Sequence, residues 1–162
     1  MKTAPDIRNR DERFGRGFTI VELIAAITIL LILTSVALPI ARIQAQRTRE
    51  VELRRALREL RQAIDRYKDF ADRGMIPSKP DSFGYPPDLE TLVNGVPLKG
   101  SSTAKYKFLR RVPVDPMTAK TEWSLRALQD DPDSRSWGGG NVFDVSSRSQ
   151  GTALDGTRYV DW

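Results

Sequence analysis

Two hydrophobic patterns follow one another along the first half of the chain. An uncharged run extends from Leu23 to Ala41. Its length is close to the ~20 residues that an apolar helix needs to span a bilayer. From Arg42 to Arg73 apolar residues instead recur at alternating steps of four and three, which indicates one apolar face of a helix. This apolar stripe consists of Leu53, Leu57, Leu60, Ile64, Tyr67 and Ala71.

The two patterns together predict one long helix from Phe18 to Arg73, roughly 84 Å in length. Gly74 and Pro77 directly follow it, as expected at a helix C-terminus. Pro39 lies inside the predicted helix, where it removes one backbone hydrogen bond and should bend or loosen the helix. Only the first half can lie in a membrane, so the striped half should pack on the rest of the chain.

Charged residues four apart predict two ion pairs on this helix. Glu50 precedes Arg54, and Asp69 precedes Arg73, by one helical turn each. The stripe covers fewer than the three to four heptads expected of a coiled coil. Packing on the chain's own C-terminal domain is therefore favoured over a coiled-coil seam.

The remaining residues, 74–162, predict a small domain of short elements. The segment 86–95 begins with two prolines and ends with glycine, which is typical of a short helix. Three later segments have strand-like composition: 122–128, 141–146 and 157–162. Three short strands need the long helix to cover one face of their sheet. The expected fold class is therefore α+β, with a long N-terminal helix packed on a small antiparallel sheet.

The composition excludes several kinds of site. The chain has no cysteine and no histidine, so disulfides, zinc–thiolate sites and Cys- or His-based catalysis are excluded. The net charge is +5, and acidic residues are interleaved with the arginines of the helix. A mixed-charge solvated face is the simpler interpretation of that pattern. We therefore expect neither an enzyme nor a nucleic-acid partner. The alternatives are a membrane-anchored enzyme and a protein that binds nucleic acid.

Glu22 is unusual because it lies just inside the apolar N-terminal segment. A charge deep in a membrane helix costs roughly 2.5–3.5 kcal/mol on insertion scales, so it usually has a function. The alternative is that Glu22 lies at the interface and reaches water. The apolar run itself also fits an ordinary membrane anchor, or a secretory signal cleaved near 35–37. Arginines flank the run on both sides, so the positive-inside rule leaves its orientation open.

The residues around Glu22 resemble the sequence motif of a known protein family. Gly17 followed by Phe18-Thr-Ile-Val-Glu22-Leu-Ile resembles the processing and assembly motif of type IV pilins and type II secretion pseudopilins. The resemblance implies a pilin-like fold and cleavage by a prepilin peptidase between Gly17 and Phe18, with methylation of the new N-terminus. It also implies that Pro39 is the helix-kinking proline of the family. Glu22 would then pair with the α-amine of a neighbouring subunit, because a buried charge is tolerated when it is paired.

Later segments are most similar to the G-type, or major, pseudopilins. They are Gly84-Tyr85-Pro86 with Leu89 to Leu92, Phe108 to Pro116, Val142 to Ser147, and Leu154 to Trp162. The similarity implies a structural subunit of a type II secretion pseudopilus, a periplasmic filament that drives protein export. The alternative is a type IV pilus subunit for adhesion, motility or DNA uptake.

The resemblance also implies an organisation, a location and partners. Residues 1–17 would be a cytoplasmic leader, 18–41 the transmembrane and filament-core half of the helix, 42–73 its amphipathic half, and 74–162 the periplasmic domain. The protein would cross the inner membrane once, in contact with lipid, before assembly. Its partners would be further copies of itself, the prepilin peptidase, minor pseudopilins, and the inner-membrane assembly platform with its ATPase.

Calcium is the one cofactor that the resemblance suggests, bound in a C-terminal loop. Calcium takes six to eight oxygen ligands, and only Asp155 and Asp161 are candidates here. The family's usual Gly-Ala-Asp-Gly run is absent from this loop. The alternative is that Asp155 and Gly156 form a tight turn while Asp161 is a solvated carboxylate at a strand end.

Overall fold

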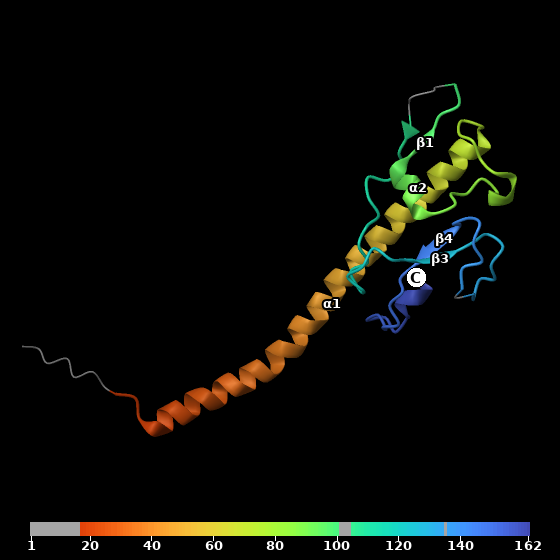
Figure 1. The fold of residues 1–162 in the computed structure, drawn as a ribbon. Coiled ribbons are helices and arrows are strands. Elements are labelled where there is room, and N and C mark those ends of the chain that lie inside the picture. Colours follow the sequence, from red (N-terminus) through yellow and green to blue (C-terminus); the bar gives the residue numbers. More distant parts are fainter. Residues whose placement is uncertain (1–16, 101–104, 135) are drawn as a thin grey trace, which may run out of the picture. The chain divides into compact units, whose positions relative to one another are not determined.

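The computed structural model describes residues 17–100, 105–134 and 136–162 (Figure 1). In chain order the elements are α1 (Ile20–Asp72), the 3-10 helix η1 (Pro80–Ser82), α2 (Leu89–Asn94), β1 (Val96–Pro97), β2 (Lys105–Tyr106), β3 (Ser124–Arg126), β4 (Asp144–Ser146) and the 3-10 helix η2 (Tyr159–Asp161). The chain divides into two compact units, Met1–Ala41 and Arg42–Trp162. The α+β class is thus confirmed at the level of one long apolar-to-amphipathic helix and short antiparallel strands.

The predicted long helix is confirmed, with limits that differ by one or two residues. α1 begins at Ile20 rather than Phe18, ends at Asp72 rather than Arg73, and continues through Pro39. Gly74 adopts a left-handed conformation with φ of 67°, and its N–H donates to the Ala71 carbonyl at 2.9 Å. The N–H of Met75 donates to the Phe70 carbonyl at 2.9 Å, which completes a Schellman motif and explains why the helix stops there.

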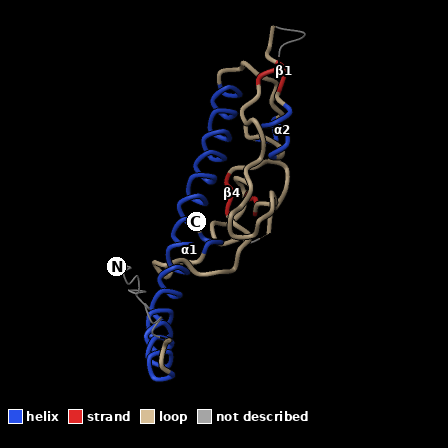
Figure 2. Tube along the Cα trace, turned by 90° about the vertical axis from the view of Figure 1, so that its left-hand side faces the viewer, coloured by secondary structure: helices blue, strands red, loops and turns tan. Residues whose placement is uncertain are grey.

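The apolar stripe of α1 forms the centre of the core. Leu53, Leu60 and Ile64 have no exposed surface, and Ala71 at the end of the stripe is half-buried. The stripe packs against residues from the short elements and loops of the second unit (Figure 2). These partners include Ile76, Leu92, Phe108, Trp123, Val142 and Val145. Burial of a side chain such as Leu60 contributes about 1.5–3 kcal/mol, so these contacts dominate the stability of this unit.

Two separate two-stranded sheets replace the single three-stranded sheet that we expected. β3 pairs antiparallel with β4, through Leu125 opposite Val145, which confirms two of the three predicted strands in shortened form. β1 pairs with β2 through Val96 opposite Tyr106, and this pair was not predicted.

The prediction of a third strand at 157–162 is wrong. Arg158 makes one isolated bridge to Thr152, and the chain then turns into η2. The turn carries the ring of Tyr159 inward, where it is only 4% exposed and its hydroxyl donates to Glu50 at 2.9 Å. This long-range bond competes with the extended conformation that the local composition favours.

The predicted short helix at 86–95 is confirmed but begins later. Asp88 is the N-cap of α2, and its carboxylate accepts the Thr91 N–H at 2.7 Å. Gly95 ends the helix with φ of 80°, and a Cβ there would lie 2.8 Å from the Tyr106 carbonyl oxygen. The Pro86 carbonyl accepts the Val142 N–H at 2.7 Å, so the proline lies in a tertiary contact rather than in the helix.

Ala119 has a left-handed backbone conformation, with φ of 57°. Residues other than glycine adopt this conformation at a cost of about 1–2 kcal/mol. We therefore expect Ala119→Gly to stabilise the fold by about 0.5–1 kcal/mol, after allowance for the greater freedom of glycine in the unfolded chain. Thermal unfolding should show a midpoint raised by a few degrees. The control Ala63→Gly, in the middle of α1, should lower it. A lower midpoint for Ala119→Gly would contradict the strain at this position.

Candidate functional site

The residues predicted for processing lie immediately before α1. Gly17 and Phe18 are exposed and non-helical. The hydroxyl of Thr19 accepts the Glu22 N–H at 3.2 Å, and the Thr19 carbonyl accepts the Leu23 N–H at 3.0 Å. Thr19 is therefore the N-cap of α1 and keeps the Gly17–Phe18 peptide bond outside the helix.

No conformational reason requires glycine at position 17. Its φ does not lie in the left-handed region, and a Cβ added there would meet no atom within 4 Å. At Gly95, by contrast, both the backbone angle and the close Tyr106 carbonyl demand glycine. The fold that the structure describes therefore does not require glycine at position 17.

Glu22 and Pro39 lie on the same helix but far apart. Glu22 is exposed in the first turn of α1, where a carboxylate also interacts favourably with the helix dipole. Pro39 lies 17 residues later, which is about 26 Å along a helix axis. The structure thus presents a carboxylate at the start of the apolar segment and a proline near its end, and it does not bring them together.

The apolar part of α1 is the one helix, within the described residues, that is long and apolar enough to cross a membrane. None of its most apolar 18-residue window is buried, whereas the core helix of a soluble protein is mostly buried. Ile20, Leu31 and Ile40 are 77%, 66% and 62% exposed. The hydroxyls of Thr28 and Thr34 donate to carbonyls one turn earlier, at 2.8 and 2.7 Å. A helix of this kind is compatible with a single-pass membrane anchor.

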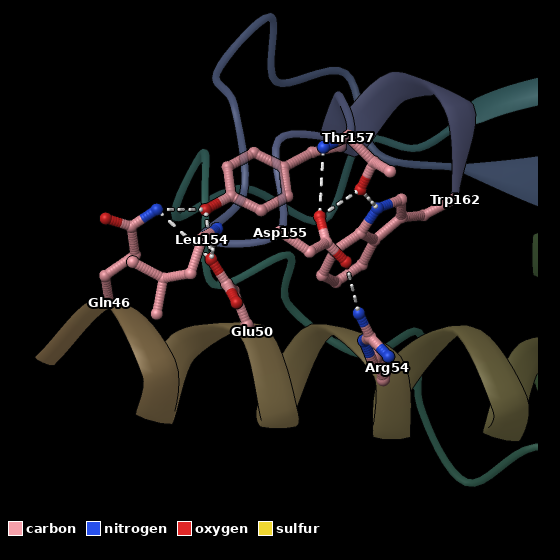
Figure 3. A network of polar contacts seen from close by, with 8 residues as sticks. Gln46, Glu50, Arg54, Leu154, Asp155, Thr157 and Trp162 are labelled. Carbon is pink, nitrogen blue, oxygen red and sulfur yellow. Dashed lines mark hydrogen bonds and ion pairs between the residues drawn. The ribbon is translucent and has the colours of Figure 1, made fainter. Parts of the chain in front are cut away.

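A polar network joins the amphipathic part of α1 to the C-terminal loop, which we define as residues 151–162 (Figure 3). Its centre is Glu50, which is 9% exposed. One carboxylate oxygen of Glu50 accepts the Gln46 amide at 3.1 Å, the Leu154 N–H at 2.9 Å and the Tyr159 hydroxyl at 2.9 Å. Burial raises the pKa of Tyr159, so its hydroxyl remains a donor at neutral pH. A buried carboxylate is thus satisfied by neutral donors.

One turn further along α1, Arg54 forms an ion pair with Asp155 at 3.2 Å. Its guanidinium also lies 4.2 Å from the centre of the Trp162 ring, a cation–π distance. Asp155 accepts the Thr157 hydroxyl at 2.6 Å and the Thr157 N–H at 2.9 Å. These bonds from Thr157, followed by the Arg54 charge, lower the pKa of Asp155.

One of the two predicted helical ion pairs is wrong. Arg73 pairs with Asp69 at 2.8 Å as expected. Glu50 and Arg54 instead bond to different residues of the C-terminal loop. The spacing of four that suggested an ion pair also places Gln46, Glu50 and Arg54 in one row, and this row was the available signal for the network.

Arg61 extends the contacts of the helix with the C-terminal residues. It donates to the Asp144 carboxylate at 2.7 Å and to the main-chain oxygens of Val145 and Trp162 at 3.1 and 2.9 Å. Arg126 also pairs with Asp144, at 2.7 Å, so this half-buried carboxylate lies between two guanidinium groups.

The two candidate calcium ligands are both engaged by other side chains of the chain. Asp155 is engaged by Thr157 and Arg54, and Asp161 accepts two hydrogen bonds from Arg158 at 2.9 and 3.2 Å. No group of three or more acidic side chains that could hold a metal ion occurs among the residues that the structure describes. Because calcium needs six to eight oxygen ligands, the donor set present does not fit it.

Removing the Glu50 carboxylate should weaken the folded state strongly. Glu50→Ala leaves the part-buried Leu154 N–H and the buried Tyr159 hydroxyl without their acceptor, and we expect a loss of about 2–4 kcal/mol in unfolding free energy. Urea unfolding of the full chain in detergent would measure this loss. The control Glu52→Ala removes an exposed carboxylate from the same helix and should change stability by less than about 0.5 kcal/mol. Equal stability of the two variants would contradict the network.

No family model, curated protein or solved structure matches this chain. Its function is therefore inferred from its own residues: an exposed apolar helix segment with one carboxylate at its start, and a domain fixed to the amphipathic continuation of that helix.

Proposed function

We propose that this chain is a prepilin-like filament subunit, of the kind that forms the major component of a type II secretion pseudopilus. The observation that carries the proposal is the N-terminal half of α1. None of its most apolar 18-residue window is buried, it is apolar over a membrane length, and it carries Glu22 in its first turn, shortly after a non-helical Gly17–Phe18 junction.

Cleavage between Gly17 and Phe18 would create a positive α-amine next to an apolar helix. The N-cap at Thr19 leaves this peptide bond outside the helix, where a peptidase can bind it in an extended conformation. The absence of a conformational need for glycine at position 17 supports recognition by such an enzyme. The chemistry of cleavage and methylation belongs to the prepilin peptidase, and the subunit itself catalyses no reaction.

Glu22 would then set the stagger between subunits. Before assembly lipid covers the apolar side chains of α1, and in the filament the helices of other copies replace it. A carboxylate in this apolar environment needs a partner, and the α-amine of a neighbouring Phe18 provides one. Repeated head-to-tail contacts of this kind do not close and therefore generate a filament.

The location and partners follow from this proposal. The chain would cross the inner membrane once, with its C-terminal unit in the periplasm. Minor pseudopilins and an assembly platform with its ATPase would add subunits to the growing filament, and filament growth would move folded proteins outward. Export of proteins, rather than adhesion or motility, is favoured by the similarity of the C-terminal segments to major pseudopilins.

The first test is the N-terminus of the protein recovered from the membrane fraction of its native host. Intact mass and N-terminal sequencing should show a chain that begins at methylated Phe18. A chain that begins at Leu38 would instead indicate a secretory signal, and one that begins at Met1 an unprocessed anchor. Either of these two results would overturn the proposal.

A glycine variant separates processing from folding. Gly17→Ala should fold normally, because the added methyl group meets no atom, but should be cleaved at least about tenfold more slowly. The control Gly156→Ala should show the opposite behaviour, because the φ of 86° at Gly156 makes alanine unfavourable there while the junction is unchanged. Cleavage by purified peptidase and thermal unfolding would be measured for both variants.

Loss of the Glu22 charge should impair assembly rather than processing. We expect Glu22→Ala to be cleaved at Phe18 but to give at least about tenfold fewer filaments, because the neighbouring α-amine loses its buried partner. The exposed Glu52 provides the control, and Glu52→Ala should assemble normally. Filaments would be counted by electron microscopy of sheared fractions. Normal filament yield from Glu22→Ala would disprove the charge-pairing account.

A further inference from the structure

The resemblance to pseudopilins implies calcium in the C-terminal loop, whereas the structure shows that loop bonded to α1. We propose that side chains of α1 close the C-terminal loop in place of a bound cation, so that the folded state of this chain does not require calcium. This inference does not depend on whether the chain forms filaments, because it concerns the stability of a single subunit.

The helix and the loop are aligned in register. Gln46, Glu50 and Arg54 are four residues apart, so their Cα atoms form a row along the helix with a spacing of about 6 Å. Gln46 donates to the Thr152 carbonyl at 3.1 Å, and Glu50 accepts the Leu154 N–H at 2.9 Å. Two residues of extended chain span about 6.6 Å, which matches one step of this row.

The row continues to the turn of the loop. Arg54 pairs with Asp155 at 3.2 Å, directly after the contact of Glu50 with Leu154. Three helix residues at steps of four thus contact Thr152, Leu154 and Asp155 in the same order. These contacts already hold the loop against the helix, so a bound cation is not needed to hold it there.

Hydrogen-bond donors already occupy the carboxylate oxygens of Asp155 in the loop. One oxygen of Asp155 accepts two hydrogen bonds from Thr157, and the other accepts Arg54. The hydroxyl of Thr157 in turn accepts the Trp162 indole N–H at 2.7 Å. Coordination of calcium by Asp155 would require these donors to be displaced, including one full positive charge.

Positively charged side chains outnumber negatively charged ones in the groove beside the loop. A groove of about 340 Å³ lies beside Asp155, and Arg54, Arg58 and Arg61 line it. Asp155 is the one acidic side chain among its lining residues, while a second carboxylate, Asp144, pairs with Arg61. The lining thus holds more guanidinium groups than carboxylate side chains, and this excess of positive charge repels a divalent cation. The loop is therefore built for contact with a basic helix face rather than for a metal ion.

The test measures thermal unfolding of the full chain in detergent, with EDTA, with 2 mM calcium and with 2 mM magnesium. We expect midpoints within about 1 °C of one another. If the loop bound calcium, a calcium concentration about a hundredfold above the Kd would instead raise the midpoint by on the order of 10 °C. Such a rise with calcium, absent with magnesium and lost in Asp155→Asn, would overturn the inference.

Terbium luminescence gives an independent readout at the loop itself. Trp162 is bonded to Thr157 beside Asp155, so a lanthanide bound there would be sensitised by this indole. We expect no saturable emission at micromolar terbium. Saturable emission that calcium displaces would show that a cation does bind the loop.

A variant tests whether the helix contacts hold the loop. Tyr159→Phe keeps the buried ring but removes the hydroxyl that donates to Glu50, and it should lower the midpoint by roughly 2–6 °C, equally with EDTA and with calcium. The control Tyr85→Phe, at a half-buried ring outside the network, should change it by no more than about 1 °C. If Tyr159→Phe unfolds at the wild-type temperature, the contacts with α1 do not hold the loop and the inference fails.

Discussion

The second unit depends on the burial of one helix face. Among the residues that the structure describes, its strands are two or three residues long and lie in pairs, and such pairs are not stable in water by themselves. Leu53, Leu60 and Ile64 provide the apolar surface on which these pairs and the intervening loops pack. The amphipathic part of α1 is thus the largest regular element of the unit's core.

The row of polar residues beside that face determines where the C-terminal loop lies. Apolar contacts tolerate small shifts, whereas the bonds of Glu50 to Leu154 and Tyr159 require one register between helix and loop. A one-residue shift of the loop would take away two of the three donors to the Glu50 carboxylate and leave only Gln46 of the same helix. An unsatisfied buried group costs more free energy than its hydrogen bonds contribute when they form. The network therefore selects one arrangement of the loop in addition to stabilising it.

The two parts of α1 need different surroundings. The part after Arg42 buries its apolar face within its own unit, while apolar side chains of the earlier part, such as Ile20, Leu31 and Ile40, remain exposed. Exposed apolar surface of this extent requires lipid or other protein to cover it. Lipid around a membrane anchor and neighbouring helices in a filament core could each cover this surface. In the proposed function, the chain passes from the first environment to the second after cleavage before Phe18.

The sequence by itself determined the features that depend on neighbouring residues. The helix, its apolar stripe and its end at Gly74 follow from periodicity and backbone preference, and the membrane-length run and the Gly17–Glu22 motif are visible only as local patterns. The tertiary structure decided the features that depend on distant residues. Tyr159 leaves the strand predicted from its neighbours because it bonds to Glu50, 109 positions earlier, and Arg54 pairs with Asp155 rather than within its own helix. Local propensity is worth tenths of a kcal/mol per residue, so a buried tertiary hydrogen bond outweighs it.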